Sequence, residues 1–423
     1  MTNRSPSSAA AATAHADVVV IGGGIAGLWS AALLARRGYQ VLLIDRGPLG
    51  GGQTVASQGI LHGGIKYTLG GAATAAAKAI ADMPGRWHAA MTSASSADLD
   101  LSAVRSLSPA QYLWTTGSLF SRVTARVAAT AIRTAVRRVE PAQACEGLHR
   151  ATGIDIHRVD EPVIEPRSLI AALCDIIVQA GGVISQGEPR VKTELNLRTV
   201  ELNDATVSFS TVVLAAGNGN QQLLDQIAPA QPTPAMQRRP LHMVMVRSTT
   251  GAPLPALYGH CIAALSDKPR LTITTQTDAS ERTAWYVGGN IAETGVDRSP
   301  ADQIAAARRE VAVCLPWLDL TAAQWATLRI DRAEGCTPGG EGQRPDQPVM
   351  IPVHSLESSA LAVWPTKLVF APLVGDRVVE WVTKNCVPAS GNAGAGGLDA
   401  LRGRWPLPPI AALPWDREET QWT

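Results

Sequence analysis

The chain has 423 residues, a formal net charge of +1 and a hydrophobic content of 46%. This apolar content excludes an intrinsically disordered chain, and the near-neutral charge argues against a general nucleic-acid-binding protein. Single domains commonly span about 100–200 residues, so the chain is long enough for two packed cores.

The cysteines and the N-terminus point to an intracellular protein. The 6 cysteines form no CxxC pair and have no histidine at metal-ligand spacing, so we expect reduced thiols, no metal site and a cytoplasmic location. No stretch approaches the roughly 20 continuous apolar residues of a membrane helix. Residues 1–15 are polar and lack the apolar segment of a signal peptide, which predicts a disordered leader.

The first ordered segment is predicted to be a strand–turn–helix–strand unit. Residues 17–21 (DVVVI) form a short apolar, β-branched run, which is typical of a buried parallel strand. Helix formers follow over residues 28–37, with basic residues in the last turn and Gly38 as the stop signal. A second apolar run, residues 41–44, ends at Asp45.

The turn between the first strand and the helix carries a GxGxxG pattern. Gly22 permits a tight turn, Gly24 allows a pyrophosphate to approach the backbone, and Gly27 allows the helix to pack against the strand. The helix start at Ile25 and Ala26 would direct free N–H groups and a partial positive charge at the phosphates.

Asp45 lies about twenty residues further on, where a carboxylate can accept hydrogen bonds from the adenosine ribose. The strand, the helix and the spaced acid all agree with the glycine pattern. The unit therefore predicts a dinucleotide-binding site, and a purely structural glycine turn is the alternative.

A long loop rich in glycine and hydroxyl residues follows Asp45, over residues 46–67. A nicotinamide-binding fold would normally continue into another strand–helix unit, so this loop favours FAD over NAD. It can run beside an extended cofactor and donate backbone N–H groups to it. The residues of this loop that we expect to contact FAD are Arg46, Gln53, Thr54, Ser57, Gln58 and Gly59.

The second half of this loop, residues 57–67, reads SQGILHGGIKY. It resembles the loop of the D-amino acid oxidase-like (DAO) superfamily of flavoproteins. The match is closest to FAD-linked glycerol-3-phosphate dehydrogenases and 2-hydroxyglutarate dehydrogenases. The resemblance implies an α/β fold, with FAD bound by a Rossmann-like domain of the glutathione reductase type. A substrate domain with an antiparallel sheet, of α+β type, would be inserted into it.

Two further segments fit the same superfamily. A helix that opens at Pro166 leads to strands near residues 183–184 and 189–192, and the resemblance places Val191 beside the adenine. The apolar strand 211–214 ends in a small-residue turn that resembles the second flavin-fold signature and would pack against the nucleotide. The residues of that turn are Ala215, Ala216 and Gly217.

Residues 365–377 resemble the superfamily's C-terminal flavin segment, in which a turn leads into a helix facing the pyrimidine end of the flavin. The expected flavin contacts in this segment are Leu373, Val374, Gly375 and Asp376. Lys367 stands where the usual pattern has glycine. It would place a cation near flavin N1 and the C2 carbonyl, or else form a surface salt bridge.

These motifs predict a discontinuous arrangement of domains. The expected parts are a leader (1–15), an FAD-binding domain (16–95, 161–225 and 346–386), a substrate domain (96–160 and 226–345) and an irregular C-terminal tail (387–423).

The resemblance also supplies candidate catalytic residues. It places His62 near the flavin and the substrate pocket, where a neutral imidazole can accept a hydroxyl proton. Covalent attachment of FAD and a purely structural histidine are the alternatives. Arg344 would hold an acidic substrate through its guanidinium fork, or else pair with Asp346 or Glu334. Weaker candidates are Lys66, Tyr67, Arg238, Arg239, Tyr258 and His260.

The sequence therefore predicts an FAD-dependent dehydrogenase or oxidase. It would oxidise a CH–OH or CH–NH bond of a small, acidic substrate by hydride transfer to flavin N5 and pass the electrons to O2, a quinone or a protein. The alternatives are an amine or amino-acid oxidase that uses O2, and an FAD-binding subunit with structural flavin whose Trp-rich tail docks onto a partner. A flavin-free NAD(P) enzyme is the least favoured reading. Oligomerisation and peripheral membrane association stay open.

Overall fold

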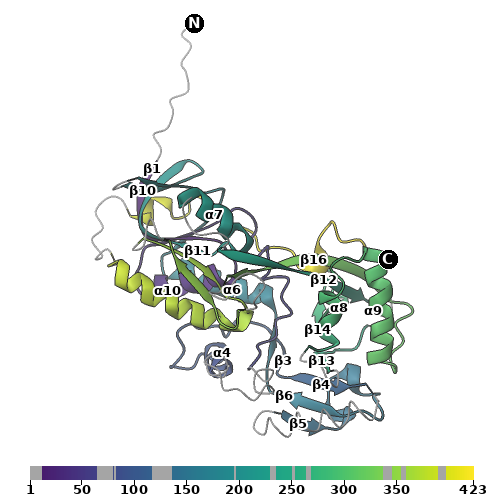
Figure 1. Ribbon diagram of the computed structural model, residues 1–423. Coiled ribbons are helices and arrows are strands. Elements are labelled where there is room, and N and C mark those ends of the chain that lie inside the picture. Colours follow the sequence, from purple (N-terminus) through teal and green to yellow (C-terminus); the bar gives the residue numbers. More distant parts are fainter. Residues whose placement is uncertain are drawn as a thin grey trace.

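The structure is a computed structural model, and its description covers residues 12–63, 80, 82–116, 136–194, 197–228, 235–249, 253–262, 268–336, 345–353, 359–388 and 397–423. Two large sheets organise these residues. The elements of the first sheet and those of the second gather in two adjoining regions, and the long strands β12 and β16 extend between them (Figure 1).

The first sheet is mainly parallel. Its strand order is β17 (Val349–Pro352), β18 (Ala360–Trp364), β11 (Ala205–Leu214), β1 (Ala12–Ile21), β2 (Val41–Asp45) and β8 (Val183–Gln186). All neighbours are parallel except β17 and β18. Two further strands, β9 (Arg190–Glu194) and β10 (Leu197–Leu202), form an antiparallel extension from β11.

Both faces of this sheet are covered, which explains the continuous apolar run in β1. Val18 and Val20 belong to the core on one face, and Val19 and Ile21 to the core on the other. The first core contains α1 (Ile25–Arg36), α6 (Pro166–Gln179) and α10 (Ala371–Asn385), and the second contains α7 (Asn220–Ile227). Helices on both faces of a mostly parallel sheet are typical of α/β folds.

The predicted leader of residues 1–15 is too long. Strand β1 begins at Ala12, and residues 12–15 pair in parallel with residues 205–208 of β11. Ala14 is buried in the second core, so this Ala-rich segment provides small side chains for the outer part of the sheet.

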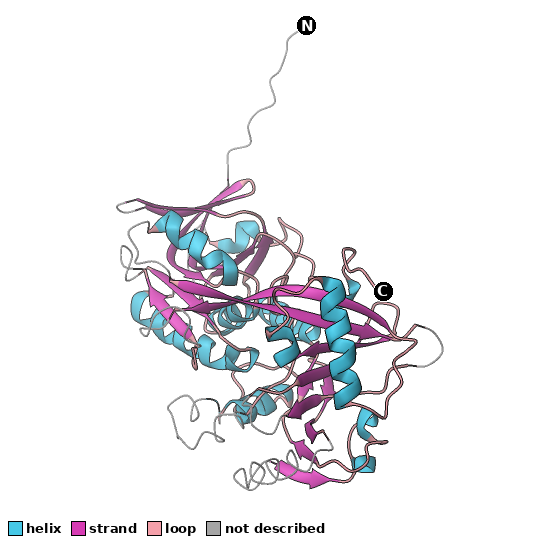
Figure 2. Cartoon of the chain, turned by 45° about the vertical axis from the view of Figure 1, so that its right-hand side comes forward, coloured by secondary structure: helices cyan, strands magenta, loops and turns pink. Residues whose placement is uncertain are grey.

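The second sheet is mainly antiparallel. Its strand order is β16 (Gln324–Gly335), β12 (Met236–Arg247), β15 (Thr283–Gly288), β14 (Leu271–Thr277), β13 (Gly259–Ile262), β4 (Gln111–Thr115), β6 (Ile156–Val159) and β5 (Val136–Val139). The helices α8 (Asn290–Glu293) and α9 (Pro300–Cys314) lie along it (Figure 2). The expected α/β class, with a Rossmann-like sheet and an antiparallel sheet, is confirmed.

Alternation along β12 shows how this sheet joins the rest of the molecule. Val244 and Val246 face the core beneath α9, whereas Met243 and Met245 belong to the same core as α1 and α10. One face of the second sheet is therefore continuous with the core of the first domain.

The remaining elements are short. They are α4 (Met83–Met91), the strand pair β3 (Ser106–Ser108) and β7 (Val163–Ile164), and the 3-10 helices η1 (Pro141–Gln143), η2 (Glu146–Leu148), η3 (Gly217–Gly219), η5 (Leu368–Phe370), η6 (Leu398–Leu401) and η7 (Pro414–Asp416). Within the residues that the structure describes, no helix combines the length and the apolar character needed to cross a membrane.

The C-terminal segment crosses both regions of the molecule. The backbone of Leu49 pairs with Pro409 and Ala411, and Trp415 packs edge-on against Tyr286 of β15. At the end of the chain, the Thr423 backbone exchanges two hydrogen bonds of 2.9 Å with that of Trp325. In the Trp-rich tail that we considered for docking onto a partner, Trp415 therefore joins parts of this chain.

Candidate functional site

The parallel order β11–β1–β2 gathers the first motifs at one edge. The carboxyl ends of these three neighbouring strands lead directly into the Ala215 turn, the Gly22 turn and Asp45, respectively. The crevice beyond the carboxyl ends of parallel strands is where ligands bind in open α/β sheets. Segments separated by almost two hundred residues of sequence thus meet at a single place.

The two glycine-containing turns are in direct contact. Gly22 has φ +119°, and a Cβ atom built on it would lie 2.4 Å from both the carbonyl carbon and oxygen of Ala215. A Cβ on Gly27 would lie only 1.9 Å from the oxygen of Gly22. The expected reasons for glycine at positions 22 and 27 are thus visible as close backbone approaches.

The N-terminus of α1 is suited to an anion. Gly24 is the N-cap and provides no side-chain cap, and the first turn contains no acidic residue. The hydroxyl of Thr54 accepts a 3.0 Å hydrogen bond from the Ile25 N–H, which fixes the loop after Asp45 to the start of the helix. Since the helix dipole and its N–H groups favour negative charge, this end fits a pyrophosphate.

Asp45 is held in place by the backbone. Its Oδ2 accepts a 2.6 Å hydrogen bond from the Gly23 N–H, and its Oδ1 accepts one of 2.8 Å from Gly47. Burial raises the pKa of this carboxyl, whereas the two N–H donors act in the opposite direction. A carboxylate offers about four lone-pair sites, so hydroxyl donors can still be accepted.

The predicted FAD loop also reaches the second sheet. The amide of Gln58 donates two hydrogen bonds of 2.9 Å, to the carbonyl oxygens of Thr272 and Tyr286. Ser57 beside it has a buried hydroxyl that finds no hydrogen-bond partner among the described residues. A buried polar atom without a partner requires explanation, and a bound cofactor would satisfy it. The glycine contacts, the helix N-terminus and this hydroxyl all fit FAD.

Not every predicted loop residue shows a contact of this kind. Arg46 is exposed, and its carbonyl accepts a 3.4 Å bond from Gln186. Gln53 lies near the second turn, with its Nε2 3.7 Å from the position of a Cβ on Gly217. Gly59 has φ +71°, and a Cβ there would lie 2.0 Å from the carbonyl oxygen of Ile164. Glycine is thus required at position 59 for packing against β7.

His62 lies at the end of this loop, beside Glu161 and against His260 of the second sheet. Its Nδ1 is 3.6 Å from Oε2 of Glu161, and its ring stacks on His260 of β13, with 5.6 Å between centroids. His260 in turn pairs through Nδ1 with the Thr272 hydroxyl at 2.7 Å. The side chain of His62 is one-third exposed, whereas Glu161 and His260 are buried.

Glu161 was missed in the sequence. It lies between β6 and β7 and belongs to no motif, and only tertiary pairing brings it to the loop: Ile60 bridges Val163, and the Leu61 N–H bonds to Pro162. His260 was among the weaker candidates, and its contact with His62 gives it a place in the site. No local pattern links either residue to position 62.

The C-terminal segment forms its helix as expected, but the helix begins about one turn earlier than the assigned contacts require. Helix α10 begins at Ala371, so Gly375 and Asp376 lie inside the helix. A Cβ on Gly375 would be 2.6 Å from Trp29 and Leu33 of α1, and Asp376 pairs with Arg86 at 2.5 Å. These contacts do not support Gly375 and Asp376 as flavin ligands.

The other two residues assigned to FAD in α10 differ in burial. Val374 is fully buried in the core shared with α1, and Leu373 is half-buried against it. The turn over residues 365–370 leads into this helix.

That turn contains a strained residue directly before Lys367. Lys367 is extended, with φ −142°, whereas Thr366 has φ +66° and donates its hydroxyl to the Gln347 carbonyl at 2.9 Å. A β-branched residue in the left-handed region is an outlier that costs roughly 1–3 kcal/mol, and such strain clusters at functional sites. The Lys367 ammonium lies 5.7 Å from the Phe370 ring.

The other candidates are placed as follows. Arg344, Lys66 and Tyr67 lie outside the described residues. Val191 of β9 is half-buried and pairs with Val200. Arg239 pairs with Glu334 at 2.5 Å and is therefore engaged in a structural ion pair. The exposed Arg238 shows no role in the site, and burial raises the pKa of Tyr258 to about 12.

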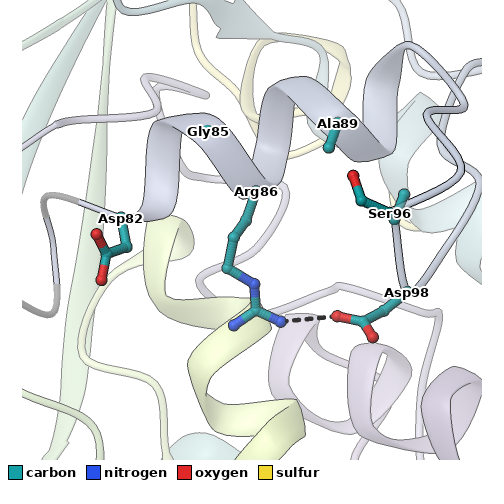
Figure 3. Close-up of a pocket in the computed structure, with 7 residues that line it drawn as sticks. Asp82, Gly85, Arg86, Ala89, Ser96 and Asp98 are labelled. Atoms are coloured by element: carbon teal, nitrogen blue, oxygen red, sulfur yellow. Dashed lines mark hydrogen bonds and ion pairs between the residues drawn. The ribbon is translucent and has the colours of Figure 1, made fainter.

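A separate surface pocket of about 510 Å³ lies along α4 (Figure 3). Arg86 points across it and is neutralised by Asp98 and Asp376, at 2.9 and 2.5 Å. Both carboxylates pair with this guanidinium, and Asp82 lines the same pocket. It shares no residue with the site at the strand ends.

Comparison with known proteins agrees with this geometry. The model of the FAD-dependent oxidoreductase (DAO) family matches residues 17–353. The probable FAD-dependent oxidoreductase PA4991 of Pseudomonas aeruginosa is 42% identical over 408 residues, which cover 95% of this chain and 97% of that protein. Its crystal structure superposes with a TM-score of 0.77 at 38% identity, with 95% and 98% of the two chains covered.

More distant structures share the fold. L-α-glycerophosphate oxidase from Mycoplasma pneumoniae, solved with FAD bound, has a TM-score of 0.62 at 13% identity and covers 95% of this chain and 99% of its own. Glycine oxidase from Geobacillus kaustophilus has a TM-score of 0.61 at 16% identity, with 92% and 98% covered. The predicted superfamily, the cofactor and the enzyme class are confirmed: this chain belongs to the DAO family of FAD-dependent oxidoreductases.

Proposed function

We propose that the protein oxidises a CH–OH bond of a small acidic substrate, with a CH–NH bond as the alternative, and that His62 accepts the proton released. Bound FAD supplies the hydride acceptor, flavin N5. The observation that carries the proposal is the position of His62, at the end of the FAD loop and stacked on a residue of the second sheet.

The residues proposed to hold FAD are those at the strand ends and in the following loop. Gly22 and Gly24 allow the pyrophosphate to approach the start of α1, Asp45 accepts ribose hydroxyls, and the small Ala215 turn packs beside the nucleotide. The Ser57 hydroxyl is available to the cofactor because no described residue bonds to it.

The residues of this chain have three roles in the proposed reaction. Imidazole Nε2 of His62 accepts the hydroxyl or ammonium proton, since a neutral histidine is a general base near neutral pH. The loop holds this ring against the second sheet, through His260 and through Gln58, so the base is positioned before the substrate arrives. Arg344 and Lys367 remain our candidates for pairing with the acidic group and for favouring the reduced flavin.

A single set of anaerobic additions tests the proposal. The visible flavin band of the purified protein is followed after addition of glycerol 3-phosphate, 2-hydroxy acids such as 2-hydroxyglutarate, and the amines glycine and sarcosine. Bleaching by a hydroxy compound alone is the expected result. Bleaching by an amine alone would indicate an amine or amino-acid oxidase instead. A flavin that no small substrate reduces, in a protein that co-purifies with another chain, would support a structural flavin instead.

Two measurements on the same purified protein address the electron acceptor, in the presence of O2, and the flavin linkage. Hydrogen peroxide formed during turnover identifies O2 as the acceptor, whereas a quinone or protein acceptor leaves none. Yellow colour that remains in an acid-precipitated pellet would show covalently attached FAD. Our assignment of His62 as the proton acceptor predicts that the colour stays in the supernatant.

A further inference from the structure

The buried carboxylate of Glu161 faces the proposed base from a segment that no motif marks. Its Oε1 accepts a 2.5 Å hydrogen bond from the Gly63 N–H, and its Oε2 accepts one from the Gln111 side chain. Only 6% of the side chain is exposed, and Oε2 also lies 3.6 Å from Nδ1 of His62. One carboxylate therefore holds the backbone next to His62 and faces its imidazole.

We propose that Glu161 is the positioning residue for His62, and this inference rests on the proposed function of that histidine. A carboxylate opposite Nδ1 favours the tautomer with the proton on Nδ1, which leaves the lone pair on Nε2 to accept the substrate proton. The same negative charge stabilises the imidazolium that forms in that step. A separation of 3.6 Å is that of an ion pair, and such contacts often shorten when substrate binds.

The second neighbour of His62 restricts the ring in a different way. His260 stacks on it with 23° between the ring planes and is itself tied through Nδ1 to the Thr272 hydroxyl. This stack limits the tilt of the His62 ring but does not distinguish its two nitrogens. Glu161 therefore has a role that the stacking partner does not provide.

Gln111 offers a matched control because it is the amide partner of the same carboxylate. E161Q keeps an oxygen for the Gly63 N–H but removes the charge that faces His62. The double substitution E161Q/Q111E keeps a carboxylate–amide pair and the net charge, but moves the charge away from the imidazole. E161D keeps a carboxylate at residue 161 on a side chain one carbon shorter.

The first test needs no substrate. The FAD-loaded, full-length protein carries ¹³C- and ¹⁵N-labelled histidine, and the signal lost from its 8 histidines in H62Q identifies His62 by NMR. We expect the Nδ1–H tautomer in the neutral form. We also expect the titration midpoint of this signal to fall by about one pH unit in both E161Q and E161Q/Q111E, and to recover largely in E161D. An Nε2–H tautomer, or an unchanged midpoint in E161Q, would overturn the inference.

The second test is a double-mutant cycle on the rate of flavin reduction by the substrate identified above. E161Q should slow reduction by roughly 10- to 100-fold in the wild-type background and should have no further effect in H62Q. Equal losses in both backgrounds would mean that Glu161 only anchors the Gly63 backbone. Wild-type reduction by H62Q would instead refute the proposed role of His62, while the NMR titration would still decide the Glu161–His62 coupling.

Discussion

Replacement of Gly22 by alanine tests the structural basis of FAD binding, because the new Cβ would meet backbone that has no room to move. It would lie 2.4 Å from the Ala215 carbonyl, whereas an ordinary carbon contact is about 3.5 Å, so the two turns must separate by about 1 Å. The φ of +119° adds strain of roughly 1–2 kcal/mol to an overpacking cost of about 1–3 kcal/mol.

If about 2 kcal/mol of this cost acts on the FAD-binding geometry, the affinity for FAD falls about 30-fold. The assay titrates flavin-free protein with FAD and follows the quenching of flavin fluorescence. Two glycines provide matched controls. G38A introduces alanine at φ +85° with no atom within 4 Å of its Cβ. G52A introduces alanine at an exposed position that is also in open space.

These controls separate strain from steric contact. G38A should lower the free energy of unfolding by about 1 kcal/mol, and both controls should bind FAD as the wild type does. FAD binding by G22A as tight as by G38A would contradict this prediction, because the close approach of the two turns would then be irrelevant to the cofactor.

Three further predictions concern the contacts of Gln58 with the second sheet, the packing of the C-terminal segment and the turn at Thr366. Gln58→Leu removes two hydrogen bonds to the second sheet and should lower the free energy of unfolding in urea by roughly 2–3 kcal/mol, and an unchanged midpoint would contradict this. Trp415→Ala should lower the free energy of unfolding by about 3–5 kcal/mol. Trp405→Ala, at a half-exposed position, should lower it by less than half as much. Equal losses of stability would show that the C-terminal segment does not join the two sheets. Asparagine tolerates a φ of +66° better than threonine, so Thr366→Asn should raise Tm slightly, and a lower Tm would show that the lost hydrogen bond to Gln347 outweighs the strain.

Local sequence patterns were sufficient to predict features that one continuous stretch of the chain forms. The run Val18–Ile21 is apolar because both faces of β1 are buried, and the spacing from Gly22 to Asp45 follows from one helix between two parallel strands. The class of the fold and the cofactor could therefore be predicted from the sequence.

The same patterns failed where distant segments decide the structure. Glu161 reaches His62 only because β7 pairs beside the loop at Ile60, and no spacing in the sequence records that pairing. The segment at residues 12–15 looked like a leader because its composition is poor in large apolar residues, yet the length of β11 offers it a partner. At the C-terminal turn, Lys367 stands where the usual pattern has glycine, yet the positive φ falls on Thr366.

His62 is proposed to accept the substrate proton while the flavin is reduced. The most direct measurement is the anaerobic rate of flavin bleaching in the wild type and in H62Q, as a function of pH, with the hydroxy compound that reduces the wild-type protein. We expect H62Q to retain the flavin spectrum but to react roughly 100- to 10,000-fold more slowly and to lose the rise of the rate with pH. A wild-type rate and pH profile in H62Q, or a flavin that no hydroxy or amino compound bleaches, would contradict the account.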